Sequence, residues 1–82
     1  MSDEITILRG RLAVAQELAE TIDMGIKIDL EELRDLADKY ADSVNLKSDR
    51  IVHVSKRIDD QVRKLRIVRA EIESLLKDLG RV

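Results

Sequence analysis

The amino-acid sequence predicts an all-α protein, an antiparallel helical hairpin that assembles into a coiled-coil or bundle oligomer. Apolar residues recur at alternating steps of three and four along most of the chain, the spacing of helices that pack on partner helices. The 82 residues include no proline and three glycines, so little interrupts a helix. They include no cysteine and one aromatic residue, which leaves an aliphatic core without disulfides. We expect one domain, residues 1–82, which oligomerises because so short a chain buries only a small core.

The first helix is expected over about residues 3–24. Ser2 is a favourable N-cap, and the acidic pair that follows it suits the positive end of a helix dipole. Apolar positions then follow from Ile5 to Ile26 in steps of three and four. Gly25 is placed to end the helix in a left-handed cap, which predicts a short turn over about residues 25–28.

The second helix is expected to be long, over about residues 29–79. Asp29 has the features of an N-cap, with Glu32 as its capping-box partner. From Leu30 to Leu79 the apolar spacing averages about 3.5 residues, the coiled-coil period. A polar cluster near residues 43–48 is an alternative helix break, but the repeat keeps its phase across it, which favours one continuous helix.

The unequal lengths of these helices predict an oligomer. A first helix of about 33 Å cannot cover a second of about 75 Å, so part of the apolar seam would face water unless other chains covered it. We therefore expect a homo-oligomer, from dimer to tetramer, or a complex with a helical protein partner. The predicted interface residues are Val44, Lys47, Ile51, Val54, Ile58, Gln61, Leu65, Val68, Ile72, Leu75 and Leu79.

Basic residues gather in the middle of the chain, although its net charge is −2. They form a ridge along one flank of the second helix: Arg50, Lys56, Arg57, Arg63, Lys64 and Arg66. Such a ridge can contact successive phosphates of a nucleic acid in a salt-dependent way. It can also pair with acidic residues of the first helix, or with the acidic 29–42 segment of a neighbouring chain. The acidic balance of the whole chain favours pairing with acidic residues of a protein over binding to a nucleic acid.

One resemblance gives the nucleic-acid alternative a specific form. The order of a short helix, a glycine-containing turn, an acidic helix start and a long helix resembles the plan of exonuclease VII small subunits, although the turn here is longer and the tyrosine is displaced. The residues concerned are Ile22-Asp23-Met24-Gly25, Leu30-Glu31-Glu32 and Tyr40. The resemblance implies a small accessory subunit of a nuclease.

The sequence contains no recognised catalytic constellation. It has no glycine-rich phosphate loop, no HExxH and no CxxC, and the single histidine, His53, falls on the outer face of the second helix. We therefore expect no enzymatic activity, cofactor, metal or small-molecule substrate. No apolar run suggests a membrane span, and the acidic N-terminus lacks signal-peptide features, which predicts an intracellular, cytoplasmic protein. The expected role is non-enzymatic: assembly, scaffolding or adaptor function through the heptad-repeat helix.

Overall fold

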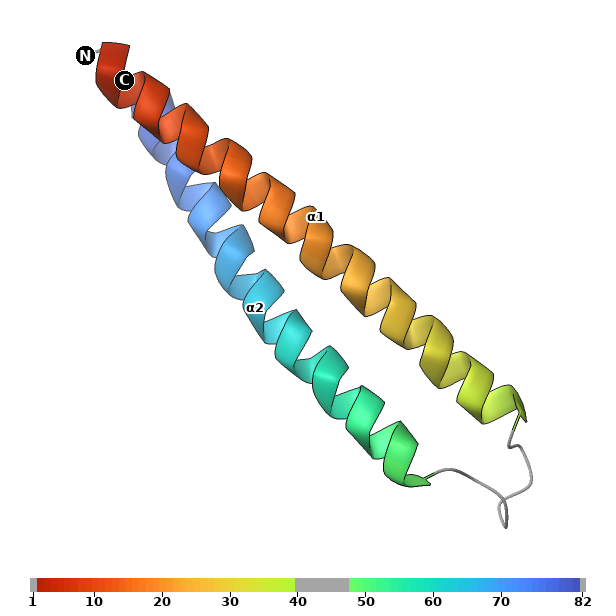
Figure 1. Ribbon diagram of the computed structural model, residues 1–82. Helices are drawn as coiled ribbons and strands as arrows, with labels where there is room; N and C mark the ends of the chain where they lie inside the picture. Colours follow the sequence, from red (N-terminus) through yellow and green to blue (C-terminus); the bar gives the residue numbers. More distant parts are fainter. Residues whose placement is uncertain (1, 40–47, 82) are drawn as a thin grey trace.

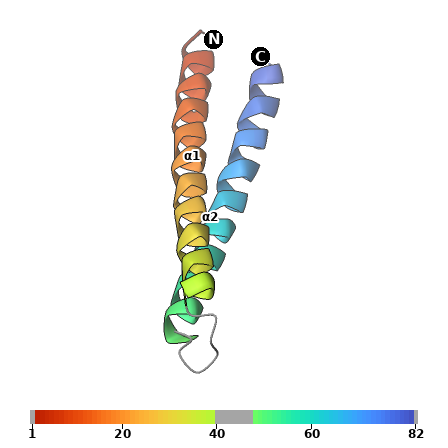
Figure 2. The ribbon, with the colours of Figure 1, turned by 90° about the vertical axis from the view of Figure 1, so that its right-hand side faces the viewer.

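The computed structural model describes residues 2–39 and 48–81, which form two α-helices. Helix α1 spans Ser2–Lys39 and helix α2 spans Ser48–Arg81. The helices lie side by side in opposite directions, so that both ends of the chain are at the same end of the molecule (Figure 1). The view turned by 90° shows the same pairing (Figure 2), and the molecule is a rod of 64 × 14 × 14 Å. The predicted all-helical hairpin is confirmed.

The expected end of the first helix is wrong. Helix α1 continues through the predicted turn at residues 25–28 and ends at Lys39. Gly25 does not adopt the left-handed conformation of a helix cap, because no glycine of the described residues has a positive φ. A glycine inside a helix costs only about 1 kcal/mol relative to alanine. Half-buried Ile26, Leu33 and Leu36 continue the apolar side of α1 beyond this position.

The expected continuous helix over residues 29–79 is also wrong. Residues 29–39 belong to α1, and the chain reverses direction between Lys39 and Ser48. Of the seam residues expected in this segment, Leu30 and Ala37 are exposed, whereas Leu33 is half-buried. The alternative break near residues 43–48 falls mostly outside the described residues, which resume at Ser48, the first residue of α2.

The core is a single aliphatic seam between the two helices. Its buried apolar residues are Ala15, Val54, Leu65, Val68 and Leu75. Partly buried apolar side chains pack around Ala15, Val68 and Leu75: Leu8, Leu12, Ala19, Ile22 and Ile72. Two helices share only one interface, so many seam residues stay half-exposed and each helix keeps its outer surface uncovered.

Candidate interaction site

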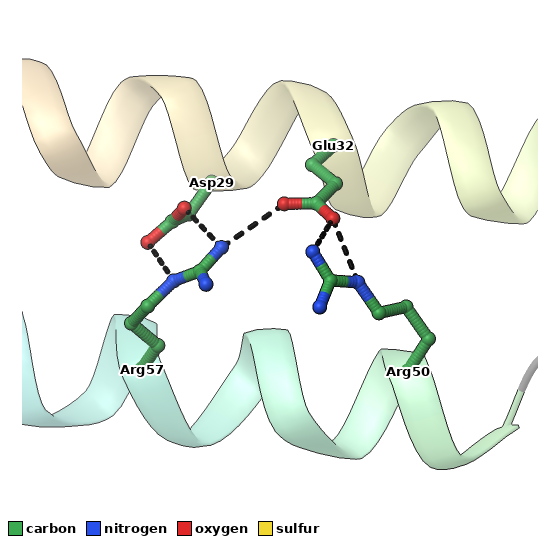
Figure 3. A network of polar contacts seen from close by, with 4 residues as sticks. All are labelled: Asp29, Glu32, Arg50 and Arg57. Atoms are coloured by element: carbon green, nitrogen blue, oxygen red, sulfur yellow. Dashed lines mark hydrogen bonds and ion pairs between the residues drawn. The ribbon is translucent and has the colours of Figure 1, made fainter.

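Four charged side chains form a cluster between the helices, the Asp29–Arg57 cluster, which consists of Asp29, Glu32, Arg50 and Arg57 (Figure 3). Arg57 donates from Nε to Asp29 Oδ2 at 3.0 Å and from Nη2 to Asp29 Oδ1 at 2.7 Å. Its Nη2 also donates to Glu32 Oε2 at 3.0 Å. Arg50 donates to Glu32 Oε1 from Nε at 2.8 Å and also from Nη2. Glu32 therefore joins the two arginines.

The electrostatics of the cluster favour its charged form. Asp29 is only 5% exposed. Hydrogen bonds from Arg57 lower the pKa of Asp29 below its ordinary value, burial acts in the opposite direction, and the charges of Arg57 and Arg50 lower it further. The same hydrogen bonds raise the pKa of Arg57. Two carboxylates and two guanidinium groups balance, so the cluster is electrically neutral and its bonds join α1 to α2.

The cluster corrects the roles expected for Asp29 and Glu32. They are not an N-cap and a capping-box partner, because both lie inside α1. Their spacing of three residues instead presents two carboxylates on one side of α1, within reach of arginines on α2.

The structure divides the basic ridge into two parts. Arg50 and Arg57 bind Glu32 and Asp29 of α1 in the same chain. Arg63 pairs with Asp59 of its own helix at 3.1 Å. The other predicted members are exposed and form no ion pair with another described residue: Lys56, Lys64 and Arg66.

The predicted oligomer interface lies against α1 of the same chain wherever it is described. Its residues from Ile51 to Leu79 are buried or half-buried, and Val54 is 0% exposed. Val44 and Lys47 lie outside the described residues. The expected shortage of cover within the chain is wrong, because α1 has 38 residues and α2 has 34.

The polar side chain of Gln61 interrupts the apolar seam, close to Gly25 of α1. A Cβ atom built on Gly25 would lie 2.9 Å from Gln61 Nε2, so the glycine makes room for this side chain. Gln61 Oε1 is buried and accepts no hydrogen bond from the described residues. Such a polar residue in an apolar seam favours one helix register at some cost in stability.

Sequence reasoning missed an exposed apolar surface on α1. Ile7, Val14 and Leu18 are 60%, 67% and 47% exposed. Together with Gly10 and Arg11 of α1 and Glu71 of α2, they line an open hollow of about 490 Å³ whose floor includes Ala15. We call this surface the α1 apolar face. A second heptad line indicates it in the sequence, because Ile7, Val14, Thr21 and Ile28 recur every seven residues beside the buried seam.

Among the described residues, no group of three or more His, Cys, Asp or Glu side chains is arranged to hold a metal ion. Neither α1 nor α2 has a stretch long and apolar enough to cross a membrane. His53 is exposed on α2.

The short-helix, turn, long-helix order behind the exonuclease VII resemblance is not the order of this fold, which has two helices of similar length. Comparison of the chain with known proteins gives no match to a family model, a curated protein or a solved structure.

Proposed function

We propose that this protein is a non-enzymatic interaction module that assembles with other helices through the α1 apolar face. The observation that carries the proposal is the row of exposed Ile7, Val14 and Leu18 beside Gly10. The surface lies next to the seam that α2 already covers, so α1 has two adjoining apolar stripes. A helix with a widened apolar stripe is typical of bundles in which each helix has more than one neighbour.

The surface area of the chain supports the proposal. A compact monomer of this mass, 9.4 kDa, would expose about 5,000 Å². This rod exposes 6458 Å². The difference, about 1,400 Å², exceeds the roughly 800 Å² that each partner contributes to a standard protein interface. The rod therefore has enough surface for a partner on one face, with the rest in water.

The charged cluster supports a structural role over the nucleic-acid alternative. Arg50 and Arg57 are the ridge members closest to acidic residues. Arg50 donates hydrogen bonds to Glu32, and Arg57 donates to Asp29 and Glu32. A phosphate could bind them only by displacing a carboxylate that is already well placed. The nucleic-acid alternative therefore loses two of the six residues of the basic ridge.

The proposal is tested by site-specific photo-crosslinking in cells that express the protein. A photo-reactive residue replaces Val14 in one variant and Leu76 in another. Leu76 is a matched control, because it is exposed and apolar but lies five positions after Glu71, about 140° around α2.

We expect discrete protein adducts from position 14 that are absent from position 76. These adducts should disappear when Leu18→Glu places a charge on the same surface, while the protein stays helical by circular dichroism. Absence of any protein adduct from position 14, or the same adducts from both positions, would contradict the proposed function.

A further inference from the structure

The α1 apolar face has the properties of a surface that binds its own copy. Resting on the proposed function, we infer that its partner is a second copy of this chain, with the two α1 helices antiparallel and related by a two-fold axis. The product is a dimer in which each hairpin contributes α1 to the contact. A two-fold contact joins the same patch on both subunits, so the patch must be complementary to itself.

The apolar side chains of the face meet this requirement. Ile7 and Leu18 stand on either side of Gly10 and Val14, about 16 Å apart along α1. Antiparallel pairing brings Ile7 of one copy opposite Leu18 of the other, twice in each dimer. Between them, a Cβ atom built on Gly10 would meet nothing within 4 Å, so the backbone is open to close approach by a second helix.

The charges on the face are self-complementary as well. Arg11 and Glu71 both line the hollow, are exposed, and form no ion pair with another described residue. A patch that carries one cation and one anion can pair both across a two-fold axis, so that each copy supplies the partner of the other's charge. A partner of uniform charge would leave one of the two residues facing a like charge.

The proposed contact does not include the Asp29–Arg57 cluster. A two-fold axis between Ile7 and Leu18 lies in the first half of α1, the helix that begins at the end of the molecule where both chain ends lie (Figure 1). The Asp29–Arg57 cluster lies further along α1, beyond this overlap, and it is already neutral and hydrogen-bonded within one chain. The proposed contact therefore leaves the Asp29–Arg57 cluster of each hairpin outside the interface.

Sedimentation equilibrium of the purified chain at micromolar concentrations tests whether the partner is a second copy. We expect a dimer for the unaltered chain and for Leu76→Glu. For Leu18→Glu, we expect the dissociation constant of the dimer to be at least about 30-fold higher. Leu18 and Leu76 are well matched, with exposed fractions of 47% and 51%. Circular dichroism should show the same helix content in all three proteins, which separates loss of the contact from loss of the fold.

Disulfide trapping tests the arrangement, because the natural chain contains no cysteine. Chains with Ile7→Cys and with Leu18→Cys are oxidised separately and as a mixture. Antiparallel pairing predicts that the mixture forms a linked heterodimer much faster than either variant links to itself. Faster self-linkage of Ile7→Cys indicates parallel helices and overturns the two-fold antiparallel contact.

The remaining outcomes separate this inference from the proposed function. A purified chain that stays monomeric overturns self-association, whereas adducts from position 14 to a different protein in cells would still support the interaction module. A dimer that Leu76→Glu dissociates and Leu18→Glu does not would overturn the assignment of the contact to the α1 apolar face.

Discussion

Asp29 shows how one residue pattern supports two structural interpretations. An aspartate followed three positions later by a glutamate is typical of a helix start, where both side chains bind backbone amides. The same spacing inside a helix puts both carboxylates on one side, and here they bind Arg57 and Arg50. The choice depends on residues that are distant in sequence, since Arg57 stands 28 positions after Asp29.

The lowered pKa of Asp29 predicts a specific loss of stability in acid. A carboxyl whose pKa is lower in the folded than in the unfolded chain stabilises the fold above its unfolded pKa, and this contribution is lost as the pH falls through the folded pKa. The unfolded value is near 3.8, so the loss falls at and below that pH. We expect the thermal midpoint of Asp29→Asn to be lower than that of the natural chain at pH 7 and to depend less on pH.

Thermal melts followed by circular dichroism from pH 7 to pH 2 measure this difference. Asp35→Asn is a suitable control, because Asp35 is exposed on the same helix and makes no ion pair with another described residue. Parallel pH profiles for the natural chain and Asp29→Asn would show that the bonds to Arg57 do not stabilise the folded state.

Gly25 is explained by a neighbour across the hairpin rather than by backbone conformation. It has no positive φ, but its missing side chain leaves space for Gln61. Alanine at a helical position is usually more stable than glycine by about 1 kcal/mol. At Gly25 this gain is opposed, because Gln61 Nε2 would have to move away from a Cβ atom at 2.9 Å.

A double-mutant cycle measures the coupling between these two residues. In a Gln61→Ala background, we expect Gly25→Ala to raise the free energy of unfolding by up to about 1 kcal/mol. In the natural background the same substitution should raise it by less, because the end of the Gln61 side chain must first move aside. Urea denaturation of the four proteins gives the coupling, and equal effects in both backgrounds would mean that Gln61 does not restrict this position.

At the scale of the helices, neither the phase of the apolar repeat nor the local stop signals locate both boundaries. Phase correctly carries α1 past Gly25, but it also predicts a continuous helix over residues 29–79, which is wrong. The apolar steps that begin at Ile5 continue through Ile26 to Leu33 and Leu36, all half-buried on α1. Gly25 and the Asp29–Glu32 pair are local signals of a helix boundary. In the structure, Gly25 instead leaves space for Gln61, and the two carboxylates bind arginines of α2. A helix ends where continuing it no longer stabilises the fold, and local preferences of about 1 kcal/mol are easily outweighed by packing.

Helix pairing also predicts different roles for two basic residues one heptad apart. Arg57→Glu should lower the thermal midpoint clearly, because it removes the bonds to Asp29 and adds a like charge beside two carboxylates. Lys64→Glu should change the free energy of unfolding by no more than about 0.5 kcal/mol, since Lys64 is exposed and forms no ion pair with another described residue.

Thermal denaturation of the two variants at equal concentration compares these effects. Both substitutions change the net charge by the same amount, so a difference between them reports the local contacts. If both variants melt at the same temperature as the natural chain, the Asp29–Arg57 cluster does not contribute to pairing of α1 with α2.

For the whole molecule, the proposed partner contact uses a different surface from the seam that the heptad repeat of α2 predicts. The repeat of α2 is covered by α1, with Val54 fully buried. The molecule is nevertheless only 14 Å across in two directions, so a large share of its apolar side chains stays at the surface. Uncovered apolar side chains lie on both helices, and on α1 they include Ile7, Val14 and Leu18, which line one hollow.

The sequence by itself determined the helical class, the aliphatic core and the heptad positions of α2 that become the seam. These follow from side-chain spacing and composition, which act locally and are visible in one dimension. Only the tertiary structure decided where the chain reverses, which acids bind Arg50 and Arg57, and which apolar line stays exposed. These features depend on which residues face one another across the hairpin, and the heptad repeat of each helix is compatible with more than one such pairing.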